Sequence, residues 1–588
     1  MRARLLVLLL FTAWLLGGCA AEPDAQRVCR VVLEHSGAFD ADEWSTETVP
    51  GGSVSFVLTP HAGWRLIGTG AAGACLTMSE DGSTVLLTLP GVRYSTAVAV
   101  QAVRSGRAIE YESNGADAAP VTVYDNGKHL RINTAAALFI RDGYTQVGWS
   151  VSPEGEGPVI SQGSRVDAAE EGQLTLYAVW AEWAPEDDFS WERQDSGAVI
   201  TGYTGQDRQL VIPGKLGGVP VMSIAQGAFA GAACGQIVLP DTLRSIDNGA
   251  FAGCAVSEIV MFDSLQMVHD GAFDNCDSLQ TLRIQAACAP VYSGTYYSTF
   301  ADKMDRLLAM RDMRKIVLFS GSSTRFGYDS AALDAAFPDY GVVNMGVFAY
   351  TNAVPQLLLI LDCMQTGDIL LDSPELDAAK RQFCTTNVLD AAFFRMLEAD
   401  YDLLARLDLR EVQGVFSAYH EYRVGRGDLP ARSHQLSAAD YDEDGTPVPT
   451  PSYNKYGDYC LYRPDAEEDA PVYGLAVPYT KAAYPQAQYI DPYNEMCRRF
   501  LDKGVQVYFT WSPRNREALS AESTPEARAE LEAYLRETLI VPMLLPLEES
   551  LVPGRLLYGT DNHLSTNGCA QRTARVIAAL KEAMGGSE

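Results

Sequence analysis

A tripeptide repeated at a fixed interval constrains the fold of this chain more than any other feature of its sequence. Gly-Ala-Phe occurs at 227–229, 249–251 and 271–273, a period of 22 residues, and the linking pieces IVLPDTLRSIDNGAF and IVMFDSLQMVHDGAF also match. Each repeat holds one short strand and one phenylalanine. A unit this small can bury its phenylalanine only against a neighbouring copy. The sequence therefore predicts a stacked solenoid over 186–286.

The repeated pattern resembles the BspA-type leucine-rich repeat. The segment ITGYTGQDRQLVIPGKLGGVPVMSI in front of it is similar to the usual start of that family. Cys254 and Cys276 take the same position in successive repeats, and Cys234 also lies in this region. We expect a ladder of small buried side chains there, rather than a disulfide or a metal site. Such a short solenoid would serve as a spacer or a modest binding face.

The first residues, MRARLLVLLLFTAWLLGGC, combine two arginines with an apolar run over 5–16 and small residues before Cys19. The run is too short for a stable membrane helix and is typical of a signal segment. Residues 16–19, Leu-Gly-Gly-Cys, resemble the bacterial lipoprotein signal, with an ordinary cleaved signal as the alternative. The resemblance implies a signal peptide over 1–18, acylation of Cys19, a polar tether over 19–27 and attachment to a membrane surface.

Charge and cysteine content exclude several classes of function. The formal net charge of −30 and the pI near 4.6 argue against a nucleic-acid partner, because phosphates require a basic surface. Of the 12 cysteines, an odd number follows Cys19, so a complete intrachain disulfide framework is impossible, although Cys29 and Cys75 could pair. The chain has no Cys-x-x-Cys and no histidine cluster. We therefore expect neither a metal nor a cofactor.

Two β-rich modules are expected before the repeats. Residues 28–105 alternate apolar and polar side chains between glycine turns, which predicts a small β domain. Residues 106–185, with FIRDGYTQVGWS and LTLYAVWAEW, resemble the Listeria–Bacteroides (internalin B-type) repeat. That resemblance implies a β-grasp-like module for spacing or adhesion, with a surface protein or a glycan as a ligand. Trp149 and Trp180 are expected in its core.

A strand that ends in serines begins the C-terminal half. Residues 315–330 read KIVLFSGSSTRFGYDS, which predicts a buried strand over 316–319 and a small-residue turn over 320–323. Ligands of open α/β sheets bind at the carboxyl edge of the strands. Ser323 is expected at that edge, as a nucleophile that needs a neighbouring base.

One histidine of this half combines a nearby acid with a helix start. The half contains three histidines: His420, His434 and His563. His563 follows Asp561 and precedes a predicted helix over 566–584 that Ser565 or Thr566 would cap. We expect His563 to be the base and Asp561 to orient it. The remaining α/β pattern predicts further strands and helices, namely 368–372 and 506–511, and 354–364, 491–503 and 524–540.

Three motifs in this half resemble the blocks of the SGNH (GDSL-type) hydrolases. GSSTRFG has Gly321, Ser323 and Gly327 in register with the nucleophile block, residues 342–346 (VVNMG) are similar to the second block, and DNHLSTNG is similar to the last. The resemblance covers 300–588. It implies a three-layer α/β domain with a parallel sheet. It also implies a Ser323–His563–Asp561 centre whose oxyanion is held by the N–H groups of Ser323 and Gly346, with Asn344 as a further donor.

Two departures from the family pattern leave alternatives open. The family's Asp-x-x-His spacing is shortened, so that Thr560 stands where the acid would be. The Gly-x-Asn-Asp block is missing, and 367–375 (GDILLDSPE) takes its place. The span of about 384–486 is interpreted as an insertion that shapes substrate access.

These features together predict a multidomain protein at the bacterial cell surface, lipid-anchored outside the cytoplasm. The predicted function is that of a serine esterase or O-acyltransferase that acts on acyl esters, above all acetyl esters, of cell-surface or environmental glycans. The alternative is a surface adhesion or binding protein whose SGNH-like domain is inactive.

Overall fold

The computed structural model describes residues 28–585, apart from 35, 62–63, 70, 72, 80–82, 105–106, 125–130, 135–137, 168–171, 270, 289, 293–294, 296, 348–349, 376–385, 427–452 and 467–475. The predicted signal peptide, Cys19, the tether over 19–27 and His434 lie outside the described residues. The chain divides into two compact units, Met1–Ser105 and Gly106–Glu588.

The described part of the first unit is built from strands. They are β1 (Cys29–Leu33), β2 (Phe39–Ala41), β3 (Ser45–Thr48), β4 (Gly52–Pro60), β5 (Trp64–Thr69), β6 (Cys75–Met78), β7 (Val85–Val92), β8 (Thr96–Val98) and β9 (Val100–Arg104). They form sheets of order β3-β1-β8, β2-β4-β7-β6 and β5-β9. Alternate side chains of β4 and β7 are buried, as the sequence pattern predicts. Cys29 is buried, Cys75 is exposed, and both are free thiols.

The second unit begins with a β module that consists of a mixed sheet and a separate two-stranded sheet. Its strands are β10 (Arg107–Glu112), β11 (Val121–Tyr124), β12 (Arg131–Asn133), β13 (Tyr144–Ser150), β14 (Arg165–Asp167) and β15 (Gly172–Glu182). The order is β11-β10-β15-β13, with β10 parallel to β15, and β12 pairs with β14. The Trp149 ring is fully buried, 4.7 Å from the Tyr111 ring. The Trp180 ring is half-buried and donates its N–H to the Ser113 carbonyl, so both tryptophans serve the core.

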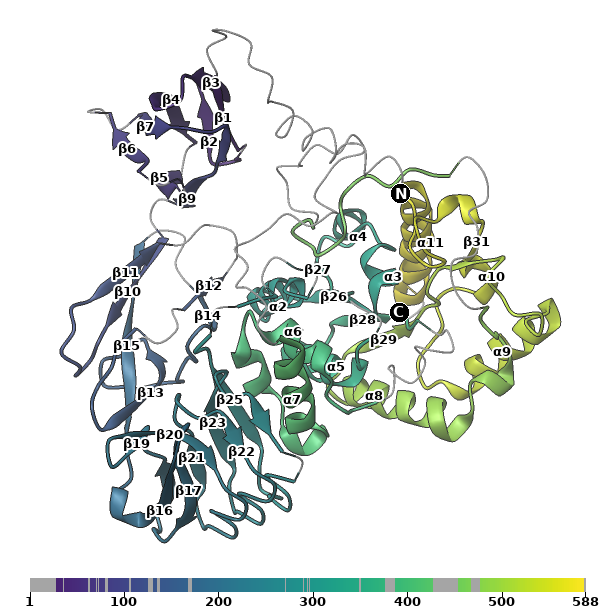
Figure 1. The fold of residues 1–588 in the computed structure, drawn as a ribbon. Coiled ribbons are helices and arrows are strands. Elements are labelled where there is room, and N and C mark those ends of the chain that lie inside the picture. The colour runs from purple at the N-terminus through teal and green to yellow at the C-terminus, as the bar shows by residue number, and fades with distance from the viewer. Residues whose placement is uncertain are drawn as a thin grey trace, which may run out of the picture. The chain divides into compact units, whose positions relative to one another are not determined.

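The repeats form the predicted solenoid (Figure 1). Its strands are β16 (Phe189–Gln194), β17 (Gly197–Tyr203), β18 (Gln209–Val211), β19 (Lys215–Leu216), β20 (Val219–Ile224), β21 (Gln236–Val238), β22 (Ser245–Ile246), β23 (Glu258–Phe262), β24 (Met267–Val268) and β25 (Thr281–Gln285). The ladders β20-β22-β24 and β18-β21-β23-β25 are parallel. In most of these strand pairs, the paired residues are one repeat apart in sequence, as Val238 and Val260 are.

Two ladders of side chains run through the repeats. The Phe229, Phe251 and Phe273 rings stack in turn, with centroids 4.8 and 4.9 Å apart. The glycine before each Ala-Phe pair has a positive φ, which explains why glycine suits that position. The thiols of Cys254 and Cys276 are buried and donate to the carbonyls one repeat earlier. The cysteine ladder is therefore a packing feature, as predicted.

The C-terminal part is a parallel sheet of order β27-β26-β28-β29 covered by helices (Figure 1). The strands are β26 (Lys315–Phe319), β27 (Gly341–Asn344), β28 (Ile369–Asp372) and β29 (Gln506–Phe509), and a short pair adds β30 (Arg514–Asn515) and β31 (Leu551–Val552). The helices are α2 (Thr299–Ala309), α3 (Ser322–Arg325), α4 (Ser330–Ala336), α5 (Ala353–Cys363), α6 (Ala391–Leu397), α7 (Val415–Arg426), α8 (Asp491–Asp502), α9 (Pro525–Thr538), α10 (Leu547–Ser550) and α11 (Thr566–Gly585).

Alternation along the strands produces three layers. Val317 and Phe319 of β26 join the cluster that includes α2, α5 and α8, whereas Ile316 and Leu318 join the cluster of α4 and α11. A strand buried on both faces reads as a continuous apolar run, as 316–319 does.

The expected insertion packs against the repeats. Its helix α7 extends the phenylalanine ladder, because the Phe416 ring stacks on Phe273 at 4.3 Å. The Tyr419 hydroxyl of the same helix donates to the Leu265 carbonyl of the solenoid. His420 therefore lies in a helix that closes the end of the solenoid.

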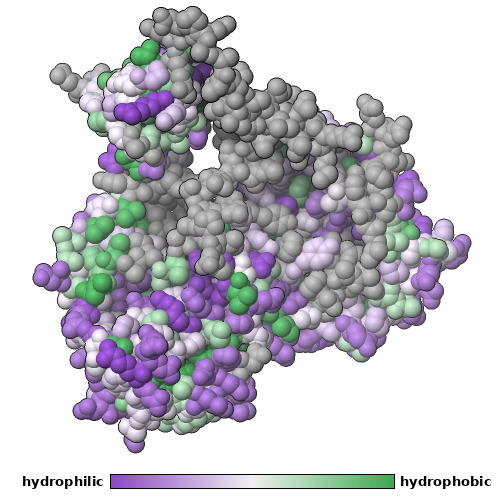
Figure 2. Space-filling view, viewed as in Figure 1, coloured by the Kyte–Doolittle hydropathy of each residue, from purple (hydrophilic) through white to green (hydrophobic). Residues whose placement is uncertain are grey.

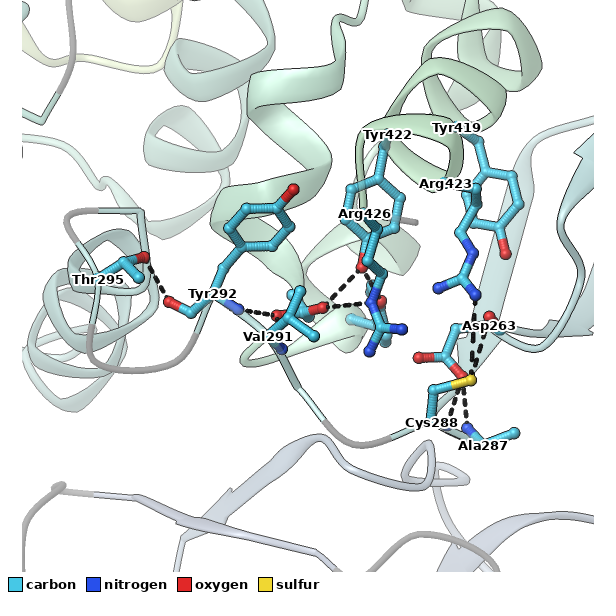
Figure 3. A network of polar contacts seen from close by, with 12 residues as sticks. Asp263, Ala287, Cys288, Val291, Tyr292, Thr295, Tyr419, Tyr422, Arg423 and Arg426 are labelled. Atoms are coloured by element: carbon cyan, nitrogen blue, oxygen red, sulfur yellow. Dashed lines mark hydrogen bonds and ion pairs between the residues drawn. The ribbon is translucent and has the colours of Figure 1, made fainter. Parts of the chain in front are cut away.

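Polar contacts complete this junction (Figure 3). The buried Asp263 carboxylate accepts the N–H groups of Ala287 and Cys288. The Glu398 carboxylate accepts those of Val291 and Tyr292, and also the Tyr422 hydroxyl and the Arg426 guanidinium. The repeats and the C-terminal part thus share one core.

The two-stranded sheet β12-β14 is fastened to the same body by Arg165 of β14. Its buried guanidinium lies 2.6 Å from Asp305 and 2.8 Å from Asp302 of α2, and its backbone N–H donates to Asp400. Charged groups this deeply buried are stable only when they are paired.

The face of the molecule drawn in Figure 2 is mostly hydrophilic. On the face drawn in Figure 2, hydrophilic residues cover most of the coloured surface and hydrophobic ones form small patches, in keeping with the net charge of −30. Within the described ranges, no helix has the length and apolar character needed to cross a membrane.

Candidate active site

The turn after β26 places two serines in different surroundings. Ser320 and Gly321 turn the chain at the end of the strand, and Ser322 is the first residue of α3. Successive residues of a helix point about 100° apart, so neighbouring serines cannot face the same way. Ser322 is 9% exposed and Ser323 is 0% exposed.

His563 meets Ser322, not Ser323. Its Nε2 lies 2.8 Å from the Ser322 Oγ. The Ser323 Oγ is enclosed and has no hydrogen-bond partner among the described residues. The expected nucleophile therefore lies one residue away from the serine that contacts the histidine, because the helix begins at Ser322 and its next residue turns inward.

Two glycines of the motifs, Gly327 of the nucleophile block and Gly346 of the second block, have a steric role here. A Cβ at Gly327 would lie 2.3 Å from the Ser323 carbonyl oxygen. A Cβ at Gly346 would lie 2.6 Å from the Arg325 backbone nitrogen. Both positions require glycine because backbone segments approach closely around α3.

The His563 ring is fixed by stacking and by its own turn. It lies flat on the Phe326 ring, with centroids 4.1 Å apart and planes 7° apart. The backbone N–H of His563 donates to the Thr560 Oγ1, 2.9 Å away. The Ser565 Oγ accepts the N–H of Gly568 and caps α11, as predicted. The histidine is thus held between a closed turn and a capped helix.

Asp561 is buried beside β30. Its Oδ1 accepts the Asn515 side-chain amide at 3.1 Å, and its carbonyl accepts the Asn515 N–H at 2.7 Å. Thr560, which replaces the family's acid, uses its hydroxyl to close the turn, donating to the Asn562 Oδ1. The shortened spacing therefore coincides with a turn closed by threonine.

The expected oxyanion donors are all engaged inside the protein. The Ser323 N–H donates to Glu375 at 2.8 Å, and the Gly346 N–H donates to the Asn344 Oδ1 at 3.0 Å. The Asn344 amide donates to the Thr324 carbonyl and to Asp458. In this structure these groups hold the loops around α3 together.

Glu375 joins the two halves of the site. Its Oε1 accepts the Ser323 N–H, and its Oε2 accepts the Asn562 amide at 2.7 Å. It also lines a small hollow of ≈ 190 Å³. The other lining residues are Val477, Tyr479, Ser512, Pro513, Arg514 and Asn562. The sequence motifs did not single out Glu375 for this role.

A second buried acid lies at the end of β28. Asp372 accepts the Tyr493 hydroxyl at 2.8 Å, and burial raises the pKa of its carboxyl to about 7 despite that hydrogen bond. Its position at the carboxyl edge places a proton-binding group in the same sheet margin as Ser322.

Comparison with known proteins identifies the repeats. Residues 222–306 match the family described as BspA type Leucine rich repeat region, in six copies. Among solved structures, the crystal structure of the T. pallidum leucine-rich repeat protein (TpLRR) is 21% identical, over 17% of this chain and 71% of that chain, with a TM-score of 0.13. No curated protein matches the chain. The chain therefore contains BspA-type leucine-rich repeats.

Proposed function

We propose that the C-terminal part is a serine esterase or O-acyltransferase with Ser322 as its nucleophile and His563 as its base. The observation that supports this most is the 2.8 Å contact between the His563 Nε2 and the Ser322 Oγ. A serine hydroxyl becomes nucleophilic only beside such a base. The end of a parallel strand is also where α/β proteins bind ligands.

In the proposed reaction, the Ser322 Oγ attacks an ester carbonyl carbon while the His563 Nε2 takes the hydroxyl proton. The tetrahedral intermediate collapses, the ester C–O bond breaks, and His563 returns the proton to the leaving alcohol. Water or a sugar hydroxyl then resolves the acyl-enzyme by the same steps in reverse. We assign the N–H of Ser322 to the oxyanion and Asp561 to the orientation of His563.

The lining of the hollow beside the site favours polar substrates. It includes Glu375, Ser512 and Arg514, which suit hydroxyl groups better than a long acyl chain. A short acyl ester of a glycan fits this character. Display at the bacterial cell surface through an acylated Cys19 belongs to the same proposal, since BspA-type repeats are typical of surface-associated proteins.

The test compares the two neighbouring serines. Hydrolysis of p-nitrophenyl acetate and labelling by a fluorophosphonate are measured for the chain without residues 1–19, and for Ser322→Ala, Ser323→Ala and His563→Ala. We expect Ser322→Ala and His563→Ala to lose roughly 10³-fold or more in rate, and the label to map to Ser322. Ser323→Ala is the matched control and should stay within about threefold, because its Oγ makes no hydrogen bond among the described residues.

Two results would change the assignment. Loss of labelling in Ser323→Ala alone would return the nucleophile to Ser323. A wild-type rate no higher than that of Ser322→Ala, with no label on either protein, would favour a surface binding protein that has no acyl-transfer activity.

A further inference from the structure

We infer that Glu375 is a positioning residue that sets the distance between the nucleophile and its base; this inference rests on the proposed function. One carboxylate contacts both halves of the catalytic pair. Its Oε1 accepts the N–H of Ser323, the residue after the nucleophile, and its Oε2 accepts the side chain of Asn562, the residue before the base.

The contacts connect segments that are distant in sequence. Glu375 lies 52 residues after Ser323 and 187 residues before Asn562. The carboxylate contacts the residue after Ser322 on one side and the residue before His563 on the other. A shift of this side chain therefore moves Oγ and Nε2 relative to each other.

Burial makes these bonds strong and selective. Glu375 is 4% exposed, Ser323 0% and Asn562 8%. Hydrogen bonds to an ionised carboxylate are shorter and stronger than neutral ones, and a buried N–H that loses its acceptor is costly. The Asn562 side chain is also fixed by a second hydrogen bond, since its Oδ1 accepts the Thr560 hydroxyl. The chain Ser323–Glu375–Asn562–Thr560 is thus continuous from α3 to the histidine turn.

Side-chain chemistry defines the variants. In Glu375→Gln, the amide oxygen can still accept the Ser323 N–H, and a flipped Asn562 amide can accept from the glutamine. Glu375→Ala removes both acceptors. Because misplacement by about 1 Å can cost 10²-fold in rate, we expect Glu375→Ala to lower kcat about 100-fold with KM changed less than threefold. Glu375→Gln should recover kcat to within about tenfold of wild type.

Asn562, whose side-chain amide donates to Glu375, offers a second variant. Asn562→Ala leaves Glu375 and Ser323 in contact and should lower kcat by a similar factor, and the double variant Glu375→Ala/Asn562→Ala should cost little more than either single one. Glu398→Gln is the matched control, because it converts a buried carboxylate at the junction with the repeats, and its kcat should stay at the wild-type value.

The experiment measures kcat and KM for p-nitrophenyl acetate, with thermal unfolding as a check of folding, for wild type, Ser322→Ala and these variants. Wild-type activity that Ser322→Ala abolishes, together with a loss of kcat in Glu375→Ala that Glu375→Gln restores, supports the inference. If Ser322→Ala abolishes activity but folded Glu375→Ala and Asn562→Ala keep kcat within twofold, the inference is overturned while the proposed function stands. If Ser322→Ala leaves the rate unchanged, both are overturned.

Discussion

The Phe326 ring lies flat against the His563 imidazole, 4.1 Å away, and it also stacks on the Tyr459 ring at 4.5 Å. Phe326 follows α3 directly, so the helix that carries Ser322 also supports the ring that Ser322 contacts. Nucleophile and base are therefore positioned by one short segment.

Replacement of Phe326 by leucine should remove the stacking contact that fixes the orientation of the His563 imidazole. We expect kcat to fall about tenfold while stability falls by about 1 kcal/mol, because a buried hydrophobic side chain remains. Esterase kinetics and thermal unfolding check both values. Phe337→Leu, a similarly buried phenylalanine at the end of α4, is the matched control. An equal loss of kcat in both variants would show that the effect comes from a general loss of packing and not from the contact with His563.

Asp561→Asn tests the orienting acid. Removal of the charge should lower kcat by roughly 10²–10⁴-fold with little change in KM, since the acid stabilises the imidazolium that forms during the reaction. Asn515→Ala, which removes a donor to the Asp561 carboxylate, should cost less. Steady-state kinetics at saturating substrate show which of the two variants loses more kcat. A kcat for Asp561→Asn near wild type would mean that another group orients His563.

Asp372 predicts a pH-dependent stability. Its carboxyl has a pKa of about 7 in the folded state against an ordinary 3.8, so the folded protein binds more protons than the unfolded chain between these values. The free energy of unfolding from this group therefore falls as pH rises from about 4 to about 7, by up to ~4 kcal/mol, and then levels off. Asp372→Asn should remove this slope and be the more stable protein at pH 8. Urea unfolding of both proteins from pH 4.5 to pH 8 measures it; parallel curves would refute the assignment.

The stack of Phe273 on Phe416 predicts energetic coupling across the junction. In a double-mutant cycle with Phe273→Leu and Phe416→Leu, we expect a coupling energy of about 0.5–1.5 kcal/mol, the usual range for aromatic pairs. Urea unfolding of the four proteins provides it. A cycle with Phe229→Leu and Phe416→Leu is the control. These two residues lie three ladder steps apart, so their effects on the free energy of unfolding should be additive.

Sequence reasoning succeeded where one residue type recurs at a structural period. The 22-residue spacing predicted both the solenoid and its phenylalanine ladder, and the apolar run 316–319 predicted β26 within one residue. Helix α11 begins at Thr566, as its serine cap predicted. Local patterns carry this information because repeats, strands and caps are decided by neighbours in the sequence.

The site was harder because it depends on where a helix starts and on contacts over long distances. The Gly327 register pointed to Ser323, whereas the start of α3 directs Ser322 to His563. Glu375 meets Asn562 across 187 residues, and nothing in the sequence pairs them. The packing of α7 on the repeats was equally unpredictable, since an amphipathic helix does not specify its partner.

The contacts of Arg165 can form only in a certain order during synthesis of the chain. Two of its partners, Asp305 and Asp400, follow it by 140 and 235 residues. At a synthesis rate of about 5–20 residues per second, the later partner emerges on the order of 10–50 s after the arginine. The strands around Arg165 can pair long before that, but its contacts with Asp305 and Asp400 form only after α2 and the segment near 400 have been made. Assembly of this part of the protein is therefore completed by residues that are made well after its own strands.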